Sequence, residues 1–131
     1  MSEASRDERL SVLVAEDSPD NRLLQLYMFR RLGLEPDFCE NGQEAVKATE
    51  KRDYDLIFLD IQMPVMCGLE TVKHLRAKGI QTPIVALTAH AMVTFKKECL
   101  EAGFNSIITK PFRIEELAKI VANTENRIAL S

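Results

Sequence analysis

The sequence predicts a single α/β domain with one doubly wound, parallel sheet of five strands flanked by five helices. Short apolar runs alternate along the chain with amphipathic helical patterns, which is typical of parallel strands joined by crossover helices. The run Leu-Ile-Phe-Leu at residues 56–59 has no polar residue, as expected of a strand buried on both faces of a sheet. A chain of 131 residues is close to the usual size of one domain.

Five apolar runs are the predicted strands. They span residues 10–15, 34–39, 56–59, 84–87 and 106–109. Pro36 lies inside the second run, and proline donates no hydrogen bond to a neighbouring strand. We therefore expect the second strand at an edge of the sheet rather than in its centre.

Five segments between and after these runs are the predicted helices. Ser18 is the expected N-cap of the first, with Pro19 at its first position, and Gly33 ends it. The residues of this helix expected to face the sheet are Leu24, Tyr27 and Met28. The other four helices are predicted at residues 42–51, 69–78, 91–102 and from residue 114 onward.

Composition and charge exclude several classes of function. A net charge of −3 without a basic stripe argues against direct contact with nucleic acid. No apolar run approaches the roughly 18 residues of a membrane span, so no membrane contact is expected. The three cysteines lack metal-ligand spacing and are expected as reduced thiols of a cytoplasmic protein. The polar residues 1–9 do not have the pattern of a signal peptide.

Polar residues stand where three of the predicted strands end. Glu16 and Asp17 follow the first strand, Asp60 follows the third, and Thr88 follows the fourth. Taken one at a time, each is more readily explained as a cap of the next helix or turn. Parallel strands bring their carboxyl ends to one edge, where open α/β sheets bind ligands. Together these residues indicate a site for a metal ion and a phosphoryl group.

Four motifs resemble the receiver domain of bacterial two-component response regulators. They are Glu16-Asp17, Asp60 with Met63-Pro64 and Gly68, Thr88-Ala89, and Lys110-Pro111, in the order and spacing of that family. The resemblance covers residues 10–123 and implies a flavodoxin-like sheet with strand order 2-1-3-4-5. It also implies a flexible tail at residues 1–9, a receiver domain at 10–125, and a tail or the end of the last helix at 126–131.

The resemblance implies specific roles for the residues at this edge. Asp60 is the expected phosphoacceptor, which takes a phosphoryl group from a kinase phosphohistidine, and Thr88 and Lys110 are expected to contact that group. The implied ligands of Mg²⁺, or of Mn²⁺ as a substitute, are Glu16, Asp17, Asp60 and the backbone carbonyl of Gln62. Mg²⁺ favours such oxygen ligands. The domain is not expected to be an enzyme in the usual sense, although it should also remove its own phosphoryl group.

Five further positions are expected to tune this chemistry. They are Gln62, Ala89, His90, Ile107 and Pro111, the last through a cis bond after Lys110. For His90 an exposed position at the start of the fourth helix is an equally good interpretation. Ile107 stands where the family usually has Tyr or Phe, so the usual aromatic switch is absent. Either the switch tolerates isoleucine, or the signal leaves by another surface, or the domain passes its phosphoryl group onward.

The expected partners are a histidine kinase, a histidine phosphotransfer domain, or both. The segments around Thr88 and Lys110 look most like receivers of hybrid histidine kinases. Two settings remain open, a stand-alone regulator and a receiver taken from a larger hybrid kinase, and the oligomeric state is open as well.

Three rival functions are weaker. A magnesium-dependent phosphatase with an aspartyl nucleophile would carry a second Asp where this chain has Gln62. In a flavodoxin-like electron carrier, the Glu16-Asp17 pair would repel a flavin phosphate. A scaffold that is never phosphorylated is the third rival, and it would not need the complete set of site residues present here.

Overall fold

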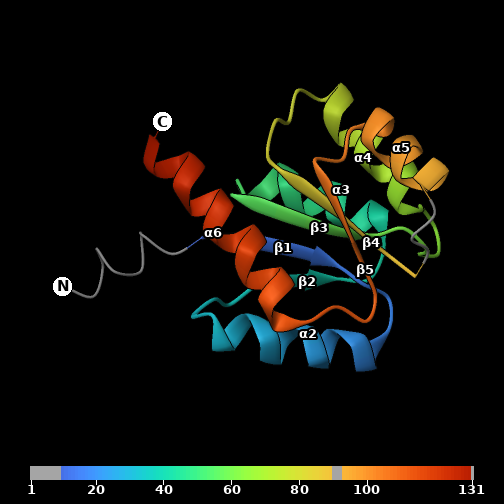
Figure 1. The fold of residues 1–131 in the computed structure, drawn as a ribbon. Coiled ribbons are helices and arrows are strands. Elements are labelled where there is room, and N and C mark those ends of the chain that lie inside the picture. Colours follow the sequence, from blue (N-terminus) through green and yellow to red (C-terminus); the bar gives the residue numbers. More distant parts are fainter. Residues whose placement is uncertain (1–9, 90–92, 131) are drawn as a thin grey trace.

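The computed structural model describes residues 10–89 and 93–130. Strands and helices alternate in this part of the chain, as predicted (Figure 1). The strands are β1 (Val12–Ala15), β2 (Asp37–Cys39), β3 (Leu56–Asp60), β4 (Ile84–Thr88) and β5 (Ser106–Thr109). The helices are α2 (Pro19–Arg31), α3 (Gly42–Lys51), α4 (Gly68–Ala77), α5 (Val93–Ala102) and α6 (Ile114–Leu130).

The strands form one parallel sheet in the order β2-β1-β3-β4-β5. This confirms the predicted flavodoxin-like order and the edge position of the second strand. The order reverses between β1 and β3, which lie side by side although a strand and two helices separate them in the chain. Ligands of open α/β sheets bind at such a point, beyond the carboxyl ends of the strands.

Two helical layers cover the two faces of the sheet. Helices α2 and α6 lie on one face, and α3, α4 and α5 lie on the other (Figure 1). β3 is buried along its whole length, as its apolar sequence predicted. Its alternate side chains enter separate cores on the two faces of the sheet. Phe58 packs edge to face against Phe29 of α2, with 5.4 Å between the ring centroids, whereas Leu59 shares a core with Val72 and Leu75 of α4.

Most element boundaries agree with the sequence prediction, and the differences have local causes. β2 begins at Asp37 rather than at residue 34, directly after Pro36, which has no N–H for the ladder. β3 and β4 each extend one residue beyond the apolar run, so that Asp60 and Thr88 are the last residues of their strands. α6 continues to Leu130, through most of the segment expected as a tail or helix end. Along the described chain, no helix is both long and apolar enough to cross a membrane.

The predicted inward face of α2 is wrong. Leu24 and Tyr27 are 49% and 61% exposed, whereas Gln25 and Phe29 are the buried residues of this helix. The apolar side chains of α2 are therefore split between the core and the surface, and a polar amide occupies a core position. A pattern that assigns apolar residues to the core could not predict this arrangement.

The first turn of α4 lacks the side-chain cap found in the two preceding helices. Ser18 caps α2 and Asn41 caps α3, each by accepting a backbone N–H bond. The N-cap of α4 is Cys67, which has extended backbone angles but makes no side-chain cap bond. A residue that accepts strongly at this position would satisfy an N–H group of the first turn.

We therefore expect Cys67→Ser to raise the free energy of unfolding by about 1 kcal/mol, the usual effect of a good N-cap. Urea unfolding in metal-free buffer measures the change. Cys67→Ala is the matched control, because it removes the thiol without adding an acceptor. Equal stability of the serine and alanine variants would contradict the prediction.

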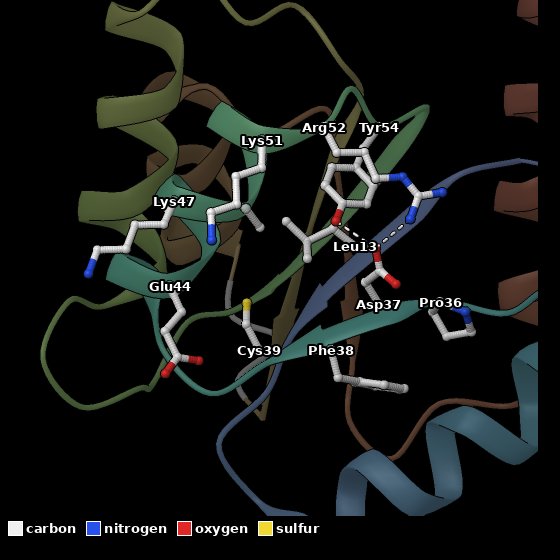
Figure 2. A pocket seen from close by; sticks show the side chains of 11 residues that line it. Leu13, Pro36, Asp37, Phe38, Cys39, Glu44, Lys47, Lys51, Arg52 and Tyr54 are labelled. Carbon is white, nitrogen blue, oxygen red and sulfur yellow. Dashed lines mark hydrogen bonds and ion pairs between the residues drawn. The ribbon is translucent and has the colours of Figure 1, made fainter.

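A groove of about 640 Å³ lies between α3 and the edge strand β2 (Figure 2). The Oδ2 atom of Asp37 accepts hydrogen bonds of 2.7 Å from both Arg52 and Tyr54, and the Arg52 guanidinium lies over the Tyr54 ring. Burial raises the pKa of Cys39 in this groove to about 12, so its thiol stays protonated and unreactive. These polar groups satisfy one another and lie apart from the ends of the central strands.

Candidate functional site

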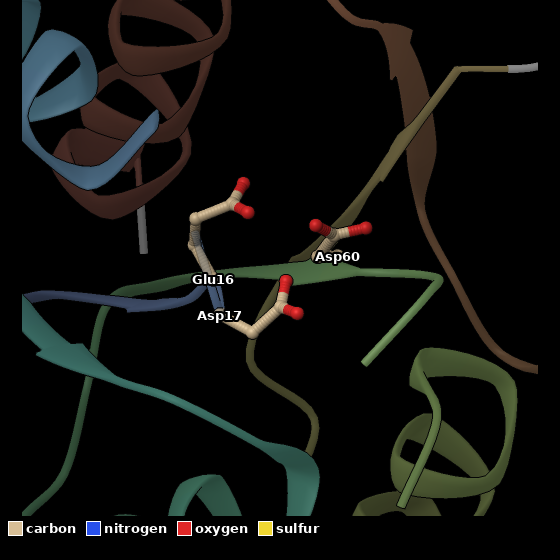
Figure 3. A group of neighbouring side chains, drawn as sticks. All are labelled: Glu16, Asp17 and Asp60. Carbon is tan, nitrogen blue, oxygen red and sulfur yellow. The ribbon is translucent and has the colours of Figure 1, made fainter. Parts of the chain in front are cut away.

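Three carboxylates meet beyond β1 and β3. Ala15 pairs with Leu59 in the ladder, so Glu16 and Asp60 come next on neighbouring strands. One oxygen each from Glu16, Asp17 and Asp60 can be chosen so that all lie within 4.8 Å of one another (Figure 3). Glu16 and Asp60 are buried, and Asp17 is exposed. The group therefore has two buried carboxylates and one that is open to solvent.

Lys110 directly follows the edge strand β5 and brings a cation to the same point. β4 and β5 are parallel neighbours, and the Lys110 N–H donates to the Thr88 carbonyl oxygen at 2.7 Å. The peptide bond between Lys110 and Pro111 is cis. The Lys110 Nζ donates to Asp60 Oδ2 at 2.7 Å and to Glu16 Oε1 at 3.4 Å. Its ammonium thus bridges the two buried carboxylates.

Neutral donors also form hydrogen bonds with both buried carboxylates. Glu16 Oε1 accepts from Gln25 Nε2 at 3.0 Å. Glu16 Oε2 lies 3.3 Å from the Ser18 N–H and 3.4 Å from Asn21 Nδ2. Asp60 Oδ1 accepts from the Gln62 N–H at 3.0 Å. The first two turns of α2 and the loop after β3 therefore orient both buried carboxylates.

Burial and the charge of the oppositely charged partner shift the pKa values of Asp60, Glu16 and Lys110 in opposite directions. Burial raises the pKa of Asp60 to about 6, with Glu16 adding to the rise and the hydrogen bond from Lys110 opposing it. Burial also raises the pKa of Glu16, but its hydrogen bonds and the charge of Lys110 outweigh this, so its pKa is lowered. The pKa of Lys110 falls with burial and rises overall because of the two carboxylates. At neutral pH the site holds an ammonium and two mostly ionised carboxylates.

A cleft of about 310 Å³ opens over these groups. Its lining includes Thr88 and Ala89 at the end of β4, together with Gln62. Most residues predicted for the site thus line one cleft. The full lining is Glu16, Asp17, Ser18, Asn21, Asp60, Gln62, Thr88, Ala89 and Lys110.

Two of the predicted tuning residues do not line this cleft, and a third cannot be placed relative to it. Pro111 lines a separate hollow of about 40 Å³ beside it, together with residues of α2. Ile107 is half-buried in β5 and packs against the core under α3, α4 and α5. His90 lies outside the described residues. The role of the Gln62 carbonyl as a metal ligand stays a prediction.

Ser18, Asn21 and Gln25 are site residues that the sequence did not predict. Ser18 is the N-cap of α2, Asn21 and Gln25 lie in its first two turns, and all three donate to Glu16. Asn21 and Gln25 are four residues apart and so lie on one face of the helix. Two side-chain amides at this spacing, shortly after the acidic end of the first strand, were the feature of the sequence that could have indicated donors to Glu16.

The donor set fits a hard divalent cation. Every candidate ligand atom is a carboxylate oxygen, which Mg²⁺ prefers over nitrogen or sulfur. Two of the three carboxylates are already held by hydrogen bonds, while Asp17 is exposed at the mouth. The like charges gathered here would repel one another less with a cation among them.

Lys110→Met should lower the free energy of unfolding in metal-free buffer by about 2–3 kcal/mol, because Glu16 and Asp60 lose the cation between them. The loss is below that of a fully buried pair because 21% of the Lys110 side chain is exposed. Urea unfolding measures it. Lys78→Met is the control: Lys78 pairs with Glu50 on the surface, and its loss should change stability by less than about 0.5 kcal/mol. Similar losses in both variants would contradict the electrostatic role of Lys110.

Comparison with known proteins identifies the family. The family model of the response regulator receiver domain matches residues 12–122. Two-component response regulator 24 of Arabidopsis thaliana is 38% identical over 116 residues, which cover 88% of this chain and 84% of that protein. Hybrid signal transduction histidine kinase G of Dictyostelium discoideum is 39% identical over 87% of this chain, which spans only 4% of the kinase's length.

A solved structure supports the same assignment. The receiver domain of sensor histidine kinase PA1611 from Pseudomonas aeruginosa PAO1 has a TM-score of 0.82 and 34% identity. The match covers 89% of this chain and 98% of that domain, in which a magnesium ion is coordinated in the active-site cleft. With its parallel sheet in the order 2-1-3-4-5 and its acidic cleft, this chain belongs to the response regulator receiver domains of two-component signalling.

Proposed function

We propose that this domain accepts a phosphoryl group on Asp60 from the phosphohistidine of a kinase or a histidine phosphotransfer domain. The observation that carries the proposal is the 2.7 Å contact between Lys110 Nζ and Asp60 Oδ2 inside an acidic cleft. A carboxylate is a weak nucleophile and needs an activated phosphoryl donor held in line with it. The cleft offers Asp60 as the acceptor and Lys110 as a point charge beside the incoming oxygens.

The transfer makes one bond and breaks one. An oxygen of Asp60 attacks phosphorus, the bond from phosphorus to the histidine nitrogen breaks, and the imidazole leaves with that electron pair. We expect Lys110 to follow the phosphoryl oxygens and the Thr88 hydroxyl to donate to one of them, since both residues line the cleft. A carboxylate loses its charge when it is phosphorylated, while the phosphoryl group brings new charge, so a nearby ammonium stabilises the product.

Glu16, Asp17 and Asp60 are the proposed ligands of Mg²⁺, with the Gln62 carbonyl completing the protein set and Mn²⁺ as a substitute. When bound, the ion neutralises charge on the phosphoryl oxygens. The carboxylate oxygens within 4.8 Å of one another support this assignment, as does the magnesium ion in the PA1611 receiver domain.

The same cleft suits hydrolysis of the acyl phosphate, so we expect the domain to remove its own phosphoryl group. Gln62 and Ala89 line the cleft beside Asp60 and are placed to influence the access of water. His90 and Pro111 are proposed to affect the lifetime of the phosphoryl group as well. Ile107 is proposed to take part in the response to phosphorylation without an aromatic switch.

The proposed docking surface for the phosphoryl donor is an apolar area on α2. We call it the α2 patch; it consists of Leu23, Leu24 and Tyr27, which are 69%, 49% and 61% exposed. Leu24 also lines the small hollow that contains Lys110 and Pro111, so the patch adjoins the phosphorylation site. Large exposed apolar side chains next to a reactive group are typical of an interface. The proposed setting is the cytoplasm, where histidine kinases present their phosphohistidine.

Intact-mass measurement after incubation with acetyl phosphate and Mg²⁺ tests the proposal. The expected result is the addition of one phosphoryl group, located by peptide mapping to the peptide that contains Asp60. The same incubation with a chelator should give little product. Absence of labelling in Mg²⁺ would favour an unphosphorylated scaffold, and release of phosphate from added phosphomonoesters would favour a phosphatase.

A further inference from the structure

The buried amide of Gln25 is an unusual feature of the helix beside the cleft. Its side chain is 3% exposed, and with Phe29 it forms the buried face of α2. The Nε2 atom donates to Glu16 Oε1 at 3.0 Å. The Oε1 atom accepts no hydrogen bond from any described residue. A helix that only had to pack would place an apolar side chain here, because an unsatisfied polar atom in the core is destabilising.

Glu16 fixes the orientation of this amide. An ionised carboxylate only accepts hydrogen bonds, so the nitrogen of the amide must face it. The unsatisfied oxygen of Gln25 is then the consequence of supporting Glu16. It is not a feature that repacking could remove while the bond to Glu16 is kept.

Glu16 needs this support because it is fully buried. Its relative exposure is 0%, although it is among the residues that line the cleft. The orientation of its carboxylate therefore decides how it faces the cleft. Among the side-chain donors to the Glu16 carboxylate, Gln25 makes the shortest contact; Lys110 and Asn21 are both at 3.4 Å. Lys110 also bonds Asp60 more closely, at 2.7 Å, so it is shared. Gln25 therefore supports the Glu16 carboxylate alone, whereas Lys110 divides its hydrogen bonds between Glu16 and Asp60.

From these contacts we infer that Gln25 is a positioning residue for the divalent-cation site, acting through Glu16. The inference rests on the proposed function, in which Glu16 is a metal ligand. Groups that hold a metal ligand in place commonly change metal affinity by tenfold or more when they are removed. Gln25 does not line the cleft, so its effect should appear in affinity for the ion before any step of transfer.

The decisive experiment is a double-mutant cycle read by Mg²⁺ affinity. Gln25→Met keeps the length of the side chain and removes its donor, and it should weaken Mg²⁺ binding about 10-fold in a titration followed by backbone amide NMR shifts. Glu16→Asp shortens the carboxylate so that it no longer reaches Gln25. In that background, Gln25→Met should change the affinity by less than about twofold, because the two residues no longer interact.

Thr124→Val is the matched control, since it also removes a buried polar group, on α6, whose hydroxyl bonds the Ile120 carbonyl. It should leave Mg²⁺ affinity unchanged. Thermal unfolding in metal-free buffer shows that each variant is folded, and Gln25→Asn, whose amide is too short to reach Glu16, replaces the methionine variant if that variant is unfolded.

The outcomes separate this inference from the proposed function. Equal Mg²⁺ affinity of the wild type and Gln25→Met would overturn the inference alone. An equal loss in the wild-type and Glu16→Asp backgrounds would assign Gln25 a general packing role and would also overturn it. A wild-type protein that binds no Mg²⁺ would overturn the proposed function, and the inference with it.

Discussion

Asp60→Asn should abolish labelling of the protein by acetyl phosphate in the presence of Mg²⁺. The substitution keeps the size of the side chain and its place at the end of β3, but an amide is not a nucleophile toward phosphorus. No other described carboxylate combines contact with Lys110 at 2.7 Å and a position inside the cleft. Intact-mass spectra of wild type and variant, recorded after the same incubation, measure the effect.

Two controls make this result specific. Asp53→Asn changes an exposed carboxylate away from the cleft and should label like the wild type. Asp17→Asn leaves the nucleophile in place but removes a proposed metal ligand, so labelling should be slower and should need more Mg²⁺. Equal labelling of wild type and Asp60→Asn would refute the assignment of the phosphoacceptor. Labelling of neither protein would support the scaffold alternative.

The sheet and the place of the site were predictable because they depend on local sequence. A run such as Leu56–Leu59 has no polar face, so it has to lie in the centre of a covered sheet. The carboxylate after it must then emerge at the carboxyl edge. The structure confirms this for Asp60 and places Glu16 next to it through the pairing of β1 with β3. The strand order itself came from the family resemblance, since alternation alone is compatible with several orders.

The face of α2 was not predictable in this way. Leu24 and Tyr27 have the composition of core residues, yet they are exposed, and Gln25 is buried in their place. In the observed orientation Gln25 donates to Glu16 and Phe29 enters the core, and a contact between a helix and a strand end is not encoded in helical periodicity. The observed orientation of α2 also matters for function, because it leaves apolar residues on the surface beside the cleft.

Ile107 illustrates a different limit. Its sequence position showed that the usual aromatic residue is missing, and the structure shows its half-buried side chain packed against the core of the α4 and α5 side. A β-branched side chain there has few rotamers and no polar tip. Ile107 therefore offers no aromatic ring that could swing between two positions at this site.

The α2 patch leads to the second prediction with a large effect. Leu23→Asp should slow phosphoryl transfer from a histidine phosphotransfer domain about 30-fold, which corresponds to the loss of about 2 kcal/mol at an interface hot spot. The charge would have to be buried when the partner docks. Leu23 is chosen over Leu24 because Leu24 also lines the hollow beside Lys110. Labelling by acetyl phosphate, which needs no docking surface, should stay at the wild-type rate.

Leu100→Asp is the matched control for this prediction. Leu100 lies on α5, on the opposite side of the sheet from α2, and is 51% exposed, close to the exposure of the patch residues. It should leave transfer from the phosphotransfer domain unchanged. If both variants slow transfer equally, added negative charge on the domain explains the effect, because charge alters association rates at long range. If Leu23→Asp alone slows transfer and the difference persists at high salt, apolar docking on α2 is the cause, since screening removes the long-range contribution.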